Sequence, residues 1–141
     1  MKKYLFSGID NSISTDLSLA AFRLFSGLAL AFGHGLGKIP PSERFINGTG
    51  ELGFPFPTFF AHAAGISEFV GGLFLAFGLF TRPSALFVAI TMFVAAFIKH
   101  ADDSFGSAEK AYLYLGIALV YLIIGSGRYS LDNLFRRKLN I

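Results

Sequence analysis

The sequence contains no cysteine among its 141 residues. Disulfide bonds, thiolate metal sites and dithiol redox relays within this chain are therefore excluded. Charged residues are also scarce, at 15%, whereas an ordinary soluble domain has about 25%. A soluble fold of this size has a large surface to cover with polar groups, and these charges are too few and too unevenly placed. The composition, with 18 phenylalanines, indicates a chain whose surface is covered by lipid.

Several sequence signals of soluble function are missing as well. The net charge is +3, but no block of five or more like charges forms a nucleic-acid-binding arm. No Gly-x-Gly-x-x-Gly turn, Walker loop or Gly-x-Ser-x-Gly elbow occurs. No His-x-x-x-His or Glu-x-x-His pair occurs either, so a metal site would need ligands from separate helices. The sequence therefore predicts neither a nucleic-acid partner nor a metal centre.

Long apolar stretches are what the sequence has in abundance. Four segments each approach the ~20 residues that a helix needs to cross the hydrocarbon of a bilayer. They cover about residues 17–38, 58–80, 83–100 and 109–127. The third and fourth are short enough to suit buried helices of a soluble bundle, but four such segments leave too little polar chain for that. We expect an all-α, four-helix transmembrane bundle, in a single integral membrane domain over residues 1–141.

Turn and capping residues separate the apolar segments. Pro40 is expected to end the first helix, because proline cannot continue a helix. Ser107 suits the cap of the fourth helix, and Ser130 with Asp132 suits the cap of a short amphipathic C-terminal helix. Residues 39–57, rich in glycine and proline, are expected to form the only sizeable loop.

Small residues recur at a spacing of four in the first two segments. Such strips let helix backbones approach closely in a membrane. The pairs are Gly27 with Ala31, Gly33 with Gly37, Ser67 with Gly71, and Gly72 with Ala76. They predict helix contacts, but they identify no function.

Basic residues indicate how the chain is oriented in the membrane. Lysines and arginines concentrate at the N-terminus, in the turn after the second segment and at the C-terminus. The other two connections carry fewer of them, beside several acids. Because basic residues favour the cytoplasmic side, we expect both termini to be cytoplasmic and residues 39–57 to face outward.

Two ionisable side chains lie deep within the apolar segments. Arg23 falls in the inner half of the first segment and Glu68 close to the middle of the second. An ionisable group inside a bilayer is costly and usually faces protein or a water-filled cavity. The two could pair with each other and so fix the packing of the first two helices. Alternatively, Glu68 could bind a proton or a ligand in a cavity.

Other polar residues lie where the predicted topology places the outward ends of the helices. His34 and Lys38 are four residues apart and share one helical face. The whole set comprises His34, Lys38, His62, Lys99, His100 and Glu109. Such a layer could bind an anion, a quinone head group or a metal ion. It could equally be an ordinary interfacial layer of snorkelling side chains.

Three motifs in order resemble those of a known family. The first is RLF at residues 23–25 with HGLGK at 34–38. The second is EFVGG at residues 68–72 with GLFTR at 78–82, and the third is GSGRYSLD at 125–132. The chain resembles, from about Ser18 to Phe135, the DoxX family of small four-helix bacterial membrane proteins, which are related to a thiosulfate:quinone oxidoreductase subunit.

The resemblance implies an inner-membrane location and marks several residues as candidates for function. These are Arg23, His34, Lys38, Glu68, Arg82, Arg128 and Asp132, and Ser130 belongs to the same last motif as Arg128 and Asp132. Family members that use cysteine pairs are a poor guide, because this chain has no cysteine.

The resemblance also points toward quinones and membrane redox complexes. We therefore expect an accessory or quinone-reactive subunit of a membrane oxidoreductase system, with a quinone as the candidate cofactor and redox subunits as candidate partners. Two alternatives belong to other classes: a non-catalytic membrane scaffold or assembly factor, and a small-solute or ion pathway through a homo-oligomer. The sequence leaves open whether the chain itself is an enzyme and which residues would be catalytic.

Overall fold

A computed structural model of the protein describes residues 13–139. It is 81% helical and has no strand among these residues. Four helical spans are long and apolar enough to cross a membrane, namely Ile13–Lys38, Pro57–Phe77, Thr81–Lys99 and Phe105–Ile124. The predicted all-α fold with four membrane-spanning helices and a further short helix is confirmed. The predicted orientation of the N-terminus concerns residues outside the described range.

Three of the four spans change helical type along their length. The first consists of α2 (Ile13–Leu30), a π-helical turn η1 (Ala31–Gly35) and a 3₁₀ turn η2 (Leu36–Lys38). The second consists of α4 (Pro57–Ile66), a π-helical turn η3 (Ser67–Gly71) and α5 (Gly72–Phe77). The third consists of α6 (Thr81–Val94) and a π-helical turn η4 (Ala95–Lys99), and the fourth is α7 (Phe105–Ile124). The π-helical turns are of interest because such turns often occur at functional sites.

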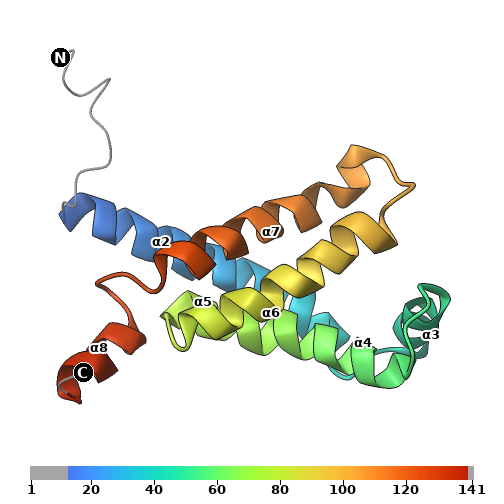
Figure 1. Cartoon of the computed structure of the whole chain (residues 1–141), viewed down its shortest axis with the longest axis horizontal. Coiled ribbons are helices and arrows are strands. Elements are labelled where there is room, and N and C mark those ends of the chain that lie inside the picture. The colour runs from blue at the N-terminus through green and yellow to red at the C-terminus, as the bar shows by residue number, and fades with distance from the viewer. Residues whose placement is uncertain (1–12, 140–141) are drawn as a thin grey trace, which may run out of the picture.

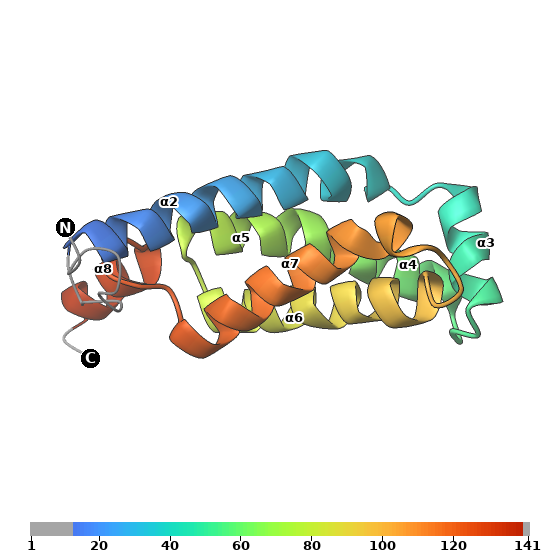
Figure 2. The ribbon, with the colours of Figure 1, turned by 90° about the horizontal axis from the view of Figure 1, so that it is seen from above.

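Two shorter helices mark the two ends of the bundle. Helix α3 (Glu43–Glu51) joins the first two spans, and α8 (Leu131–Lys138) follows the fourth. Figure 1 shows α3 and α8 at opposite ends of the molecule, and Figure 2 shows α2 beginning near α8 and running toward α3. We refer to these as the α3 end and the α8 end. Helix α2 packs on α5, α6 packs on η3 and α5, and α7 packs on α6.

Several helix ends differ by a few residues from the sequence-based expectation, and two of these differences change a connection between spans. Residues 39–57, expected to be a loop, contain α3, whose first turn is capped by the Ser42 hydroxyl accepting from the Phe45 amide at 3.3 Å. The fourth span begins at Phe105, one turn earlier than Ser107 would allow as a cap, with Ser104 at the N-cap position. The Phe105 ring stacks on Tyr112 with ring centroids 5.7 Å apart, which favours this extra turn.

Small residues let α2 and α5 approach closely, as predicted for the pairs Gly27 with Ala31 and Gly72 with Ala76. A Cβ atom added to Gly27 would lie 2.6 Å from the backbone nitrogen of Ala76 and 2.6 Å from the carbonyl oxygen of Gly72. Within the described part of the chain, nothing lies within 4 Å of a Cβ added to Gly33 or Gly37. The prediction of a helix contact is therefore wrong for that pair, because the face that packs on the second span carries Gly27, Ala31 and Gly35, and Gly33 and Gly37 lie on another face of the helix.

The distribution of side chains is that of a protein in lipid. The fully buried core is built mainly from small residues, such as Ala31, Ala85 and Ala118. Large apolar side chains point outward instead, for example Phe25 and Ile123. A soluble protein rarely exposes apolar area on this scale. The four spans and this arrangement together mean that the chain is a membrane protein with a lipid bilayer around it.

Gly27→Ala is expected to lower the free energy of unfolding in detergent by about 1–3 kcal/mol, because backbone atoms of α5 occupy the space of the new methyl group. Gly116→Ala is the matched control, since a Cβ at Gly116 meets nothing within 4 Å among the described residues. Unfolding followed by circular dichroism measures both. Equal stability of the two variants would mean that α2 and α5 are not in close contact.

Candidate functional site

An apolar pocket of about 290 Å³ lies near the α3 end, and we call it the α3 pocket. Helices α3, α4 and α6 and the turns η2, η3 and η4 contribute its walls. Aromatic and aliphatic side chains form much of these walls, including Phe45, Phe54, Phe60, Phe87 and Ile90. Phe87 and Ile90 are also exposed on the surface of the bundle. The pocket is therefore open toward the lipid along α6.

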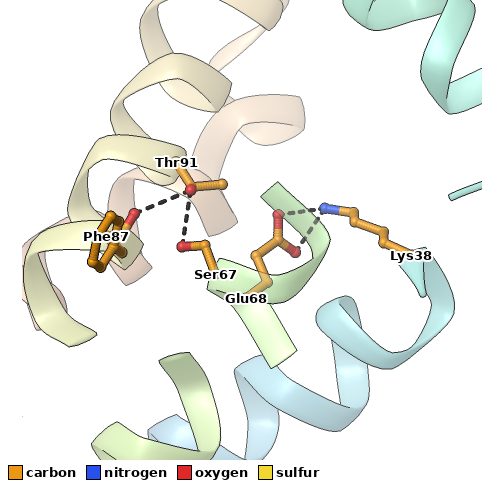
Figure 3. A network of polar contacts seen from close by, with 5 residues as sticks. All are labelled: Lys38, Ser67, Glu68, Phe87 and Thr91. Carbon is orange, nitrogen blue, oxygen red and sulfur yellow. Dashed lines mark hydrogen bonds and ion pairs between the residues drawn. The ribbon is translucent and has the colours of Figure 1, made fainter. Parts of the chain in front are cut away.

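An ion pair is set into the wall of this apolar pocket. The Lys38 ammonium donates to both carboxylate oxygens of Glu68, at 2.5 and 2.6 Å. The Glu68 side chain is only 3% exposed, whereas that of Lys38 is 30% exposed. Figure 3 shows the Lys38 side chain extending from the end of the first span to reach Glu68. The long lysine stem thus brings a cation to a carboxylate that lies in the middle of the second span.

The π-helical turn η3 directs neighbouring side chains toward different helices. Ser67 points toward α6, while Glu68 points toward Lys38 (Figure 3). The Thr91 hydroxyl oxygen lies 3.0 Å from the Ser67 hydroxyl and 3.0 Å from the carbonyl oxygen of Phe87. A hydroxyl group has one proton and can donate to one acceptor at a time. The pocket has the Lys38–Glu68 ion pair on one wall and the paired hydroxyl groups of Ser67 and Thr91 on another.

Helix α3 covers the pocket through aromatic contacts. The Lys38 ammonium lies 5.4 Å from the centre of the Phe45 ring, a cation–π contact. The Phe54 and Phe60 rings pack with centroids 5.0 Å apart. Thr49, which also lines the pocket, donates its hydroxyl proton to the Phe45 carbonyl at 2.8 Å. Helix α3 is therefore part of the site rather than a simple connection.

The histidines predicted to form an outward layer lie apart from this pocket. His34 packs its ring edge against Tyr114 of α7, with centroids 5.5 Å apart. His62 is exposed, and its Nδ1 atom lies 2.8 Å from the Thr58 carbonyl oxygen of its own helix. His34 and His62 therefore do not share a site with Glu68 through direct contact.

The other residues of the predicted outward layer are divided between the surface and the α3 pocket. His100 pairs with Asp103 at 2.6 Å in the turn before α7, and Glu109 is exposed near the start of α7. Lys38 and Lys99 line the α3 pocket. No group of three or more His, Asp or Glu residues that could hold a metal ion occurs among residues 13–139. Only the lysines of the predicted layer thus meet at the pocket.

Arg23 and Glu68 do not pair, so this possibility raised from the sequence is wrong. The buried Arg23 guanidinium donates to the carbonyl oxygens of Ala76 at 3.4 Å and Tyr129 at 2.7 Å, and also to that of Ser126. Ala76 lies in the last turn of α5, and Ser126 and Tyr129 lie between α7 and α8, where no helix uses their carbonyl groups. Arg23 therefore fixes the connection between α7 and α8.

The motif residues of the α8 end act partly as expected. The Ser130 hydroxyl caps α8 by accepting from the Asn133 amide at 3.1 Å. Asp132 instead caps α6, because its carboxylate accepts from the amides of Phe80 at 2.7 Å and Thr81 at 3.0 Å, and from the Thr81 hydroxyl at 2.8 Å. The expectation that Asp132 caps its own helix is thus wrong.

The two remaining motif arginines, Arg82 and Arg128, are both exposed. Arg82 donates to the Ile123 carbonyl at the end of α7, at 3.3 Å. The backbone carbonyl of Arg128 accepts from the Asn133 side chain at 2.7 Å. The Arg128 side chain makes no hydrogen bond or ion pair with the described residues, and the functional role that the family resemblance implies for it stays a prediction.

Comparison with known protein families bears on all of these residues. The family model of DoxX matches residues 18–101, which include Arg23, Lys38, Glu68 and Arg82. The chain belongs to the DoxX family. The resemblance noted from the sequence motifs is thereby confirmed, and the α3 pocket lies within the matched part of this DoxX protein.

Individual relatives cover most of the DoxX chain. A Bacillus subtilis protein named "Putative oxidoreductase CatD" is 31% identical over 120 residues, which are 84% of this chain and 87% of the relative. An uncharacterized protein of Haemophilus influenzae is 31% identical over 133 residues, which are 89% of this chain and 87% of the relative. The inner membrane protein YqjF of Escherichia coli is 32% identical over 111 residues, which are 74% and 82% of the two chains. No solved structure matches.

Three residues of the α3 pocket were not singled out from the sequence as site residues. Ser67 and Thr91 are hydroxyl residues in the middle of apolar segments, and Phe45 is an aromatic residue in a stretch expected to be a loop. A polar residue directly before Glu68 and a threonine inside the next span are the signals that would have indicated them. Phe45 can be recognised as a pocket residue only once residues 43–51 are known to be helical.

Lys38→Met is expected to lower the free energy of unfolding in detergent by about 3–5 kcal/mol, because it leaves the buried Glu68 carboxylate without its cation. Glu68→Gln should cost clearly less, because the partly exposed Lys38 side chain can turn outward to water. Thermal unfolding in one detergent compares the two. Lys99→Met, which removes another lysine from the same pocket, is the control and should change little. A larger loss for Glu68→Gln than for Lys38→Met would contradict the assigned burial of the pair.

Proposed function

We propose that this DoxX protein is an inner-membrane, quinone-reactive subunit of a membrane oxidoreductase system, and that the α3 pocket receives the quinone head group. The oxidoreductase part is supported by the name of the Bacillus subtilis relative. The inner-membrane part is supported by the name of the Escherichia coli relative. The basic last turn of α8, with Arg136, Arg137 and Lys138, supports a cytoplasmic C-terminus.

The observation that carries the proposal is an ion pair at the wall of an apolar, aromatic-lined pocket. A quinone head group is a flat ring with carbonyl oxygens, so it needs apolar walls and a few directed donors. Ligand pockets usually have such a composition, with volumes from about 300 Å³ upward. The α3 pocket, at about 290 Å³, suits a single ring. The exposed Phe87 and Ile90 leave a path by which an isoprenoid tail reaches the lipid.

Each polar group of the pocket has a role in this proposal. Lys38 donates a hydrogen bond to one quinone carbonyl, and Glu68 holds the ammonium in place through two contacts. When Thr91 donates to Ser67, the Ser67 hydroxyl keeps its own proton as a donor on another wall. The Glu68 carboxylate is the group of the pocket that takes up or releases a proton beside the ring. Reduction of the quinone to the quinol takes up two electrons and two protons. The protons come from water through Glu68, and because the chain has no cysteine, we place the electron donor in a partner subunit.

Binding of a short-chain ubiquinone or menaquinone analogue to the reconstituted protein tests the proposal. Wild type should bind saturably, and Ala64→Phe should abolish binding because the new ring fills the pocket. Glu68→Gln should weaken binding roughly tenfold, since a charge-assisted contact orients the Lys38 donor. His34→Ala is the matched control and should bind as wild type does, because His34 packs against Tyr114 outside the pocket.

Two results would count against a quinone site. One is the absence of saturable binding to a wild-type protein that unfolds cooperatively. The other is binding that persists unchanged in both Ala64→Phe and Glu68→Gln. In either case, partner proteins recovered equally with wild type and Glu68→Gln would favour a membrane scaffold or assembly factor.

A further inference from the structure

A second pocket, of about 600 Å³, lies at the α8 end and has no part in the proposed quinone site. We call it the α8 pocket. It is enclosed by the start of α6, the end of α7 and α8, together with the glycine-rich turn at residues 125–127. Arg82, Asn133 and Arg136 line it on the polar side, and Phe80 and Ile124 line it on the apolar side.

Buried contacts hold the walls of the α8 pocket in place. The Arg23 guanidinium binds the carbonyl oxygens of Ser126 and Tyr129, and so fixes the turn between α7 and α8. The Asp132 amide donates to the Gly78 carbonyl at 2.9 Å, which ties α8 to the turn before α6. The pocket is therefore a fixed feature of the fold rather than a gap between independent helices.

The charge that faces the α8 pocket is positive. Asp132 is the one acidic residue lining it within the described part of the chain, and its oxygens already accept from the first amides of α6. Arg82 gives one hydrogen bond to Ile123 at 3.3 Å, and Arg136 gives one to the Asn133 side-chain oxygen at 3.1 Å. A guanidinium has five N–H donors. Both arginines therefore retain donors for an anion.

Asn133 orients one of these two arginines. Its side-chain nitrogen donates to the Arg128 carbonyl at 2.7 Å, so its oxygen is left to accept from Arg136. The Arg136 guanidinium is thereby held beside the pocket. The fork geometry of arginine suits the oxygens of a phosphate group.

The position of the α8 pocket indicates where such a phosphate comes from. The third span begins at Thr81 and the fourth ends at Ile124, so the pocket lies where two membrane-spanning helices meet the interface. Phe80 is 62% exposed and Ile124 is 49% exposed beside the arginines. A phospholipid matches this arrangement, because its phosphate and its acyl chains need a basic and an apolar surface side by side.

We propose that the α8 pocket binds an anionic phospholipid, with Arg82 and Arg136 donating to the phosphate and the acyl chains lying over Phe80 and Ile124. Phosphatidylglycerol is the probe. Native mass spectrometry of the delipidated protein in a neutral detergent measures the bound fraction during a titration. Arg82→Gln and Arg136→Gln should each weaken binding roughly tenfold, since each removes a charge-assisted hydrogen bond.

The matched control is Arg137→Gln, which removes the same charge from the same helix, one residue away and outside the pocket. It should leave phosphatidylglycerol binding unchanged. Equal losses for Arg136→Gln and Arg137→Gln would overturn the proposal, because they would mean that general attraction to a basic helix explains the binding. Arg136 is exposed and its hydrogen bond goes to Asn133 of the same helix, so its variant is expected to fold.

Two further ligands identify which part of the lipid is recognised. Diacylglycerol, which has acyl chains but no phosphate, should not bind to the α8 pocket. Inorganic phosphate should compete with phosphatidylglycerol only weakly, because it lacks the apolar part. Competition by phosphate at the same concentration as the lipid would overturn the assignment to a lipid, and so would retention of diacylglycerol that equals retention of phosphatidylglycerol.

Discussion

Every polar group within a membrane span must find its partner inside the protein, and this constraint organises both ends of the molecule. Arg23 satisfies this constraint by donating to three backbone carbonyls at the α8 end, and Glu68 satisfies it by pairing with Lys38 near the α3 end. Each solution ties together segments that are distant in the sequence. The two pockets follow from these ties, because one is walled by the ion pair and the other by the turn that Arg23 holds.

Close packing of the first span on the second makes the ion pair possible. A Cβ at Gly35 would meet the Phe69 backbone nitrogen, and a Cβ at Gly65 would lie 2.7 Å from the Lys38 carbonyl oxygen. These two glycines therefore let the spans lie near enough for Lys38 to reach Glu68. Ser67 and Glu68 are adjacent in the helix and therefore point in different directions, so Ser67 faces Thr91 while Glu68 faces Lys38. Backbone geometry thus separates the polar groups onto different walls of one apolar pocket. A ring bound between those walls would meet donors on more than one side.

Much of the fold could be predicted from the sequence, because long apolar segments, the Ser130 cap and the family motifs are local signals. The partners of individual side chains could not. Arg23 and Glu68 were the two deep charges, yet each is satisfied by a group that sequence spacing does not reveal, namely carbonyls after α7 and a lysine at the end of a span. A spacing of four also does not reveal which face of a helix meets a neighbour, and Gly33 and Gly37 face no other helix among the described residues. Helix α3 was missed because its glycines, with the prolines beside it, indicated a loop.

Photoaffinity labelling with an azido-quinone, followed by peptide mapping, tests the central claim most directly. A quinone that binds beside the Lys38–Glu68 pair should label the walls of the α3 pocket, at Ala64 and Thr91 in particular, and an excess of unlabelled quinone should remove the label. Labelling spread over the lipid-facing side chains of α7, such as Leu113 and Ile123, and insensitive to competition would contradict it. Quinone would then be only a solute of the surrounding bilayer.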